Sequence, residues 1–247
     1  MKKEHLSKEY KKNGYFIVKN FLKRTDLKKI LRDLNLIILK NKNVFYDKEN
    51  KIRRIEKIYN KSKIFRNLNK DILKFLKYIF KENFTIFKDK VNFKPPGGEG
   101  FYPHYDGIFH FVKNKKKMRG WYEYSNVFIN CLVALDNCNK NNGTLELAKE
   151  DKSSFDQLIK KTKKDGTQIL LDSVTKKKRF KKIILSKGDV VFFSNRCAHK
   201  SKKNLTKKMR RVLYYTYNPI KFGKNYSKYF KDKEQSKSAH KSISGAA

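Results

Sequence analysis

The chain has 247 residues, 38% of them hydrophobic and 14% aromatic, which excludes a disordered protein and provides enough apolar material for one packed domain. Three cysteines without paired spacing exclude a disulfide framework and a cysteine zinc site. The formal net charge of +39 attracts anions of every kind, but only ten of the 62 basic residues are Arg and the lysines are spread along the chain, so a nucleic-acid partner is not expected.

Helices are predicted mainly in the first third of the chain. A short helix over residues 7–13 ends before a glycine, and a strand follows over 15–18. Thr25 and Asp26 are candidate caps of a second helix, which carries apolar residues on one face. A third helix is predicted over 62–81 from apolar residues at helical spacing.

No segment near the N-terminus resembles a targeting or membrane sequence. The first residues are polar and lack the apolar core of a signal peptide. The apolar stretch over 34–39 is far too short to cross a bilayer. We therefore expect a cytoplasmic protein with no membrane span.

From about residue 84 onward, short apolar runs alternate with turn signals, which is typical of an antiparallel jelly roll. We predict strands over 84–93, 99–106, 126–135, 144–148, 168–172, 182–185, 190–193, 197–201 and 210–217. Helices near 153–162 and 226–235 are expected to interrupt or close this β-region.

These elements predict a mainly β fold with helical N-terminal support. One domain is expected over 1–236, with its helical support mainly at 7–81 and its β-core at about 84–219. The last residues, 237–247, are rich in Ser, Lys, Ala and Gly and predict a flexible tail.

Two of the five histidines are candidates for a metal site. His104 and Asp106 are two residues apart in a predicted strand, so their side chains share a face. His199 follows in a later predicted strand and supplies a second imidazole. Two histidines and one carboxylate form the facial triad of non-haem Fe(II) oxygenases, which leaves three coordination positions open. The alternative is a surface histidine beside a turn and a hydrogen-bonded histidine within the sheet.

Arg210 and Arg211 open the next predicted strand after His199. A 2-oxoglutarate bound at iron would have a remote carboxylate, and a guanidinium binds a carboxylate with two parallel hydrogen bonds. Ser201 shares a strand face with His199 and can donate a further hydrogen bond. Strand alternation allows only one of the two arginines to face inward, and the alternation alone leaves that choice open.

Several segments form one pattern along the chain: the runs 92–98, 103–106, 142–147 and 188–193, followed by His199, Ser201, Asn204, Thr206 and Arg210. This pattern resembles the phytanoyl-CoA dioxygenase family of 2-oxoglutarate oxygenases. The resemblance covers roughly residues 8–235 and implies a double-stranded β-helix, the cupin-like jelly roll. It also implies His104, Asp106 and His199 as iron ligands. Arg210 is implied as the partner of 2-oxoglutarate, with help from Ser201, because it matches the family spacing after the second histidine.

The chain departs from the family pattern in two places. Residues 148–152 replace a Pro-Gly-Ser-His turn, which affects local structure more than chemistry. Tyr105 stands between the two metal ligands where relatives often have an amide, so the shape of the substrate site near iron is expected to differ.

The resemblance implies an Fe(II)- and 2-oxoglutarate-dependent dioxygenase that uses dioxygen to hydroxylate a small molecule. The lysine-rich loop over 113–119 predicts a lid with a cationic rim, which suits a small phosphonate- or carboxylate-bearing substrate, and the alternative is a loop of lysines that only contact solvent. Some segments look closest to the branch of the family that acts on aminoalkylphosphonates. The predicted substrate-binding residues are Asn92, Lys94, Tyr105 and Arg119.

Two other functions stay open from the sequence. The first is hydroxylation or demethylation of nucleic acid or protein by the same iron chemistry, which the charge of +39 favours. The second is a non-catalytic β-sandwich binding protein whose triad is vestigial.

Overall fold

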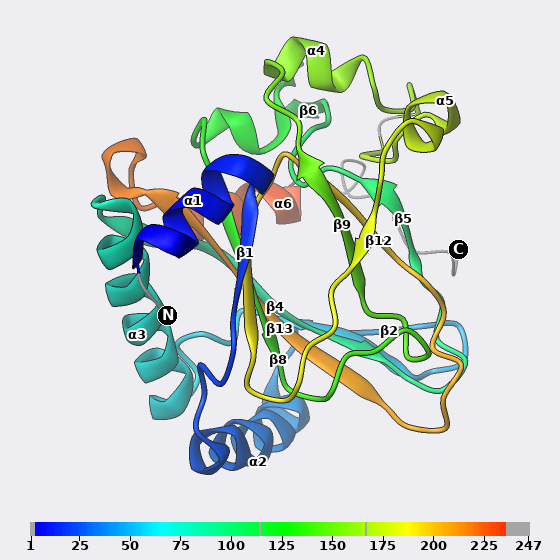
Figure 1. Cartoon of the computed structure of the whole chain (residues 1–247). Helices are drawn as coiled ribbons and strands as arrows, with labels where there is room; N and C mark the ends of the chain where they lie inside the picture. Colours follow the sequence, from blue (N-terminus) through cyan, green and yellow to red (C-terminus); the bar gives the residue numbers. More distant parts are fainter. Residues whose placement is uncertain (1–2, 114, 166, 236–247) are drawn as a thin grey trace.

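A computed structural model describes residues 3–113, 115–165 and 167–235 of the chain (Figure 1). The α-helices in these ranges are α1 (Lys3–Asn13), α2 (Arg24–Lys40), α3 (Lys63–Phe80), α4 (Phe155–Ile159), α5 (Asp172–Lys176) and α6 (Tyr226–Gln235). The strands are β1 (Tyr15–Val18), β2 (Val44–Tyr46), β3 (Ile52–Glu56), β4 (Phe84–Lys94), β5 (Phe101–His104), β6 (Phe111–Lys113), β7 (Lys116–Met118), β8 (Ile129–Ala134), β9 (Leu145–Glu150), β10 (Lys181–Lys182), β11 (Val190–Ser194), β12 (Cys197–Ser201) and β13 (Arg210–Pro219). Short 3-10 turns occur at Gly120–Glu123 and Ile220–Phe222.

The strands form two main antiparallel sheets and a hairpin. The larger sheet has the order β1-β11-β8-β13-β4-β3-β2, and the smaller has the order β10-β9-β12-β5. The hairpin consists of β6 and β7. Neighbours in each sheet are often far apart in the sequence, as β5 and β12 are, which is the connectivity expected of a jelly roll.

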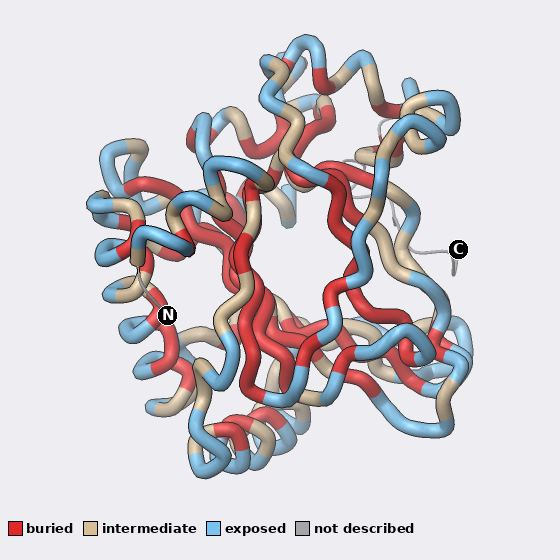
Figure 2. The backbone as a smooth tube through the Cα atoms, in the orientation of Figure 1, coloured by how far each residue is buried: buried red, intermediate tan, exposed pale blue. Residues whose placement is uncertain are grey.

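Helices α2 and α3 cover the outer face of the larger sheet (Figure 1). Apolar residues of α3 recur three or four positions apart and are buried, among them Phe65, Leu68 and Ile72. They pack with Val91 and Leu213 from the outward face of the sheet. A second apolar cluster lies between the two sheets, and Figure 2 shows the central strands of the larger sheet buried while the outer helix faces remain exposed.

An ion-pair cluster fastens α6 to the larger sheet. Lys233 of α6 donates hydrogen bonds of 2.7 and 2.6 Å to the carboxylate of Glu56, and Arg54 lies 3.2 Å from the same group. Burial alone would raise the pKa of Glu56, but the positive charges of Arg54 and Lys233 outweigh it and lower the pKa to about 2.

Most predicted elements occur where the sequence placed them, but several differ. The run 168–172 forms only isolated bridges before α5 begins at Asp172, so the predicted strand there is wrong. The first residue before α2 is Lys23 and makes no side-chain cap, so Thr25 and Asp26 do not cap this helix. Strands β2 and β3 have mixed polar and apolar character and were not predicted.

The predicted lid over 113–119 is a hairpin rather than a loop. Residue 114 lies outside the described part, but β6 and β7 pair on both sides of it, and Lys113 forms an ion pair with Asp232 of α6. The predicted tail over 237–247 also lies outside the described residues, and one domain over 1–236 remains a proposal. Among the described helices, none is long and apolar enough to cross a membrane.

Candidate metal centre

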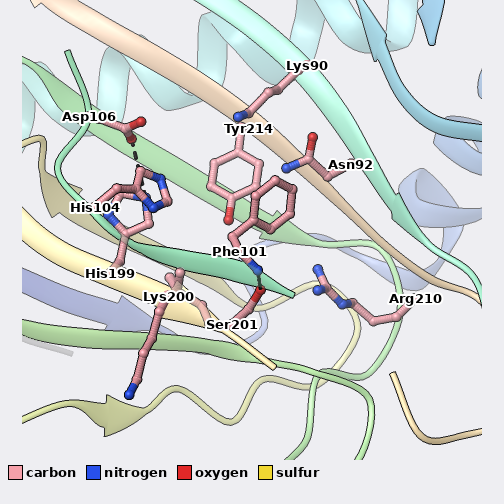
Figure 3. Close-up of a pocket in the computed structure, with 11 residues that line it drawn as sticks. Lys90, Asn92, Phe101, His104, Asp106, His199, Lys200, Ser201, Arg210 and Tyr214 are labelled. Atoms are coloured by element: carbon pink, nitrogen blue, oxygen red, sulfur yellow. Dashed lines mark hydrogen bonds and ion pairs between the residues drawn. The ribbon is translucent and has the colours of Figure 1, made fainter. Parts of the chain in front are cut away.

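Two neighbouring strands of the smaller sheet bring the candidate metal ligands together. His104 ends β5 and is the register partner of His199 in β12, with ring centroids 4.1 Å apart. Asp106 follows two residues after β5, and its Oδ2 lies 3.6 Å from Nε2 of His199. One ligand atom from each of the three side chains lies within 4.8 Å of the others (Figure 3). The three residues therefore converge as the sequence predicted.

Backbone contacts orient both imidazoles. Nδ1 of His104 lies 2.7 Å from the carbonyl oxygen of Tyr102, and Nδ1 of His199 lies 3.0 Å from that of Cys197. A hydrogen bond from each Nδ1–H to its carbonyl leaves the Nε2 lone pair as the free acceptor. This arrangement is the one found in metal-bound histidines.

The carboxylate is held by an amide. Asn130 on β8 donates from Nδ2 to Oδ2 of Asp106 over 2.9 Å, and Thr216 on β13 donates to Oδ1 of the same amide over 2.8 Å. Because Thr216 fixes the amide, its NH₂ group must face the carboxylate. The sequence reading did not include Asn130, whose position in a buried apolar strand was the available signal.

Ionisation in this centre suits a divalent cation. Burial, followed by the neighbouring His199, lowers the pKa of His104 to about 3, and burial also lowers the pKa of His199. Burial alone would raise the pKa of Asp106, but His199 and Lys88 outweigh it and lower this pKa to about 2. Two neutral imidazoles and one carboxylate are the donor set of Fe(II) oxygenases, so the residues fit that metal.

A cavity extends from the metal centre along the inward face of β4 and β13 (Figure 3). It is lined by Lys90, Asn92, Phe101, His104, Asp106, Leu145, His199, Lys200, Ser201, Arg210 and Tyr214. Lys90, Phe101, Leu145, Lys200 and Tyr214 were not among the predicted site residues. Extending the two-residue alternation from Asn92 back along β4 would have indicated Lys90.

Arg210 lies at the end of the cavity away from the histidines (Figure 3). Its side chain is buried, and Nη2 donates to the carbonyl oxygen of Gly143 over 2.8 Å. Its Nε has no hydrogen-bond partner among the described residues. A buried N–H without an acceptor is costly, so the geometry fits an anion that is bound in function.

Arg211 points to the opposite face of β13. Its guanidinium binds Asp136 through Nε at 2.8 Å and Nη2 at 3.0 Å. That bidentate ion pair occupies the fork of the side chain, so Arg210 is the arginine that faces the cavity.

Ser201 is oriented by two donors. Its Oγ accepts from Nζ of Lys94 over 2.8 Å and from the backbone N–H of Phe101 over 3.3 Å. With both acceptor positions occupied, the hydroxyl proton can point into the cavity. Lys94 also donates to the carbonyls of Lys202 and Gly143, over 2.5 and 3.3 Å, so its ammonium binds protein atoms rather than the cavity.

The turn that carries Gly143 lies against the guanidinium of Arg210. Gly143 has φ +69°, and a Cβ there would lie 2.1 Å from the carbonyl oxygen of Lys202. Both the conformation and the close contact require glycine at this position.

Two of the predicted substrate-binding residues lie away from the cavity. Tyr105 is fully buried among apolar side chains and donates from its hydroxyl to Asp151 over 2.8 Å, because strand alternation points it away from His104 and Asp106. Arg119 is half exposed and lies 3.8 Å from Asp156. With Lys94 bound to protein acceptors, only Asn92 of the four predicted residues lines the cavity.

Comparisons with known proteins agree with this geometry. A family model described as phytanoyl-CoA dioxygenase (PhyH) matches residues 10–212. A 2-aminoethylphosphonate dioxygenase from an uncultured bacterium is 30% identical over 156 residues, which is 62% of this chain and 53% of that protein. A methylphosphonate hydroxylase from Gimesia maris is 29% identical over 154 residues, covering 61% of this chain and 52% of the relative. The chain thus spans about half the length of the curated relatives it matches.

Solved structures share the fold at low sequence identity. The epimerase SnoN in complex with Fe3+, alpha ketoglutarate and nogalamycin RO has a TM-score of 0.69 at 17% identity, covering 88% of this chain and 84% of that one. EctD from S. alaskensis with 2-oxoglutarate and 5-hydroxyectoine has a TM-score of 0.68 at 14% identity, covering 88% and 76%. These similarities confirm the predicted jelly-roll fold with helical support.

Proposed function

The chain belongs to the phytanoyl-CoA dioxygenase family, as the sequence predicted, and on that premise we propose that it is an Fe(II)- and 2-oxoglutarate-dependent dioxygenase hydroxylating a small anionic metabolite. The convergence of His104, Asp106 and His199 within 4.8 Å is the observation that carries the proposal. The same cavity contains a buried guanidinium with an unpartnered Nε, which supports a dicarboxylate as the second component.

In this proposal His104 and His199 would hold iron through Nε2, and Asp106 through a carboxylate oxygen. Iron, 2-oxoglutarate and dioxygen would together supply the oxidising chemistry that converts a C–H bond to C–OH. Arg210 would bind the remote carboxylate of 2-oxoglutarate with its fork of N–H groups, and Ser201 would donate its hydroxyl proton to the same carboxylate.

The remaining residues of the chain would position these groups and exclude water. Asn130 would keep the carboxylate of Asp106 turned toward the metal, and the two backbone carbonyls would fix the imidazole tautomers. Phe101, Leu145 and Tyr214 supply apolar and aromatic surface between the metal centre and Arg210. Exclusion of water by these side chains would strengthen the ion pair between Arg210 and the co-substrate.

The substrate proposed is a phosphonate- or carboxylate-bearing small molecule. The names of the two relatives, a 2-aminoethylphosphonate dioxygenase and a methylphosphonate hydroxylase, support the phosphonate. Lys90 in the cavity lining supports an anion of either type, whereas the ammonium of Lys200 lies 3.9 Å from the carboxylate of Glu146.

Addition of Fe(II) and 2-oxoglutarate to the protein without oxygen tests the proposal. An intact centre should give a visible metal-to-ligand charge-transfer band, and His199→Ala and Asp106→Ala should remove it. With oxygen, succinate formation should increase when methylphosphonate, 2-aminoethylphosphonate or a matching carboxylate is added. A wild-type protein that gives neither the band nor succinate would show that this is not an oxygenase.

A further inference from the structure

The inward face of β4 carries two lysines beside the metal centre. Lys88 and Lys90 alternate with outward-facing residues that pack under the helices, so both side chains enter the space between the sheets. Lys90 is opposite Tyr214 and lines the cavity, where Figure 3 shows its nitrogen above the tyrosine ring. Lys88 is opposite Thr216, whose hydroxyl holds the amide that supports Asp106.

Neither ammonium group makes a direct ion pair or hydrogen bond among the described residues, and Asp106 acts on both only through its charge. Nζ of Lys90 lies 5.2 Å from the ring centroid of Tyr214, and Nζ of Lys88 lies 4.2 Å from that of Trp121 and 5.8 Å from that of Tyr229. Within residues 3–113, 115–165 and 167–235, no carboxylate or other hydrogen-bond acceptor contacts either nitrogen. Aromatic faces stabilise a cation only partly when water is displaced.

Nearby lysines behave differently. Lys94, on the same face of β4, donates three hydrogen bonds to protein acceptors. Lys113 and Lys233, near the same end of the fold, each pair with a carboxylate. Lys88 and Lys90 are both partly buried, and a partly buried ammonium without an acceptor lowers stability. Two such groups side by side therefore indicate a ligand with compensating negative charge.

This charge is separate from the part of the cavity that suits the co-substrate. Arg210 is the register partner of Lys94, the last residue of β4. Lys90 and Lys88 lie four and six residues before Lys94, toward the N-terminal end of the strand. At about 3.3 Å per residue, that separation is on the order of 13–20 Å. A dicarboxylate that reaches from the metal ligands to Arg210 leaves the two lysines without an anion.

We propose that Lys90, at the end of the cavity opposite Arg210, and Lys88, beside it on the inward face of β4, together bind a doubly charged oxyanion group of the substrate, of the phosphonate type. The inference rests on the proposed oxygenase function and identifies its substrate class. Two separate ammonium groups match a tetrahedral dianion with several acceptor oxygens better than a planar monoanionic carboxylate. Trp121 and Tyr229 form the aromatic wall beside this site.

The test uses methylphosphonate as the probe, with methanesulfonate and propionate as monoanionic comparisons. Binding is measured by calorimetry, without oxygen, to the protein loaded with Fe(II) and 2-oxoglutarate and again to the metal-free protein. We expect methylphosphonate to bind most tightly, and Lys88→Met and Lys90→Met each to weaken it at least tenfold. Lys90→Arg should retain most of the affinity. Lys28→Met, an exposed lysine of α2, is the matched control and should bind as the wild type does.

A second readout separates a binding role from a structural one. Removal of an unpartnered ammonium should raise the melting temperature of the ligand-free protein, whereas loss of a structural contact would lower it. If Lys88→Met does not fold, Lys88→Gln keeps the polar end without the charge and serves in its place. Methylphosphonate affinity unchanged in these variants, or a lowered melting temperature in both, would overturn the proposed anion site.

The charge-transfer band distinguishes the two proposals. A wild-type band together with lysine-independent methylphosphonate binding would overturn the anion site and leave the oxygenase proposal intact. Absence of the band from the wild type, with lysine-dependent binding of methylphosphonate to the metal-free protein, would overturn the oxygenase proposal and leave the anion site intact.

Discussion

Replacement of Arg210 by alanine should weaken 2-oxoglutarate binding and leave the fold intact. The side chain is 5% exposed and makes one hydrogen bond, to the carbonyl of Gly143, while its Nε has no partner in the described chain. Hydrogen bonds between charged groups contribute about 1.5–3 kcal/mol each. Loss of a two-pronged contact should therefore cost about 3 kcal/mol or more, which corresponds to roughly a hundredfold weaker binding.

The assay is a titration of 2-oxoglutarate into the Fe(II)-loaded protein without oxygen, followed by the charge-transfer band. Arg211→Ala is the matched control, because its guanidinium binds Asp136 on the other face of the same strand. That control should bind 2-oxoglutarate normally and lose some thermal stability. Weaker binding in Arg211→Ala with normal binding in Arg210→Ala would refute the assignment of the two arginines.

Three further predictions concern the supporting residues. Asn130→Ala removes the amide that holds Asp106, so Fe(II) affinity measured against a competing chelator should fall by about 10–100-fold. The lowered pKa of Glu56 stabilises the folded state above the unfolded pKa, and this contribution, on the order of 3 kcal/mol, should be lost as pH falls from about 4.5 to 2. Glu56→Gln should flatten that part of the unfolding profile, and an unchanged profile would contradict it. Tyr105→Phe should lower the unfolding free energy by about 1 kcal/mol through loss of the bond to Asp151 and leave the KM for substrate unchanged. A raised KM would return Tyr105 to the substrate site.

The three candidate metal ligands could be picked out from the sequence because their residue types are specific. Histidine is rare in this chain, and His104 and Asp106 at two-residue spacing on a strand point to one face whatever the rest of the fold does. The same alternation predicts that Tyr105 points away, and the resemblance-based assignment of this residue to the substrate site overlooked that geometry.

Lys88 and Lys90 could not be separated from the other lysines by composition. In a chain with 62 basic residues, a further lysine carries no signal by itself. Its meaning depends on which face of β4 packs under the helices and on which residues of β13 lie opposite. Those long-range pairings are tertiary information.

The strand predicted over 168–172 shows another limit of local pattern. An apolar run of this length is compatible with a strand, but only a neighbouring edge can supply a continuous ladder of hydrogen bonds. Here Ile169 and Leu170 each find a single bridge, and the chain then turns into α5.

Gly143 connects the turn before β9 to the side chains of Lys94 and Arg210. Its carbonyl oxygen accepts hydrogen bonds from both Lys94 and Arg210. A Cβ added at Gly143 would meet the backbone carbonyl oxygen of Lys202 first. A methyl group at this position would act as a wedge that separates the turn from the end of β12. Any side chain at position 143 would therefore disturb two cations, Lys94 and Arg210, at once.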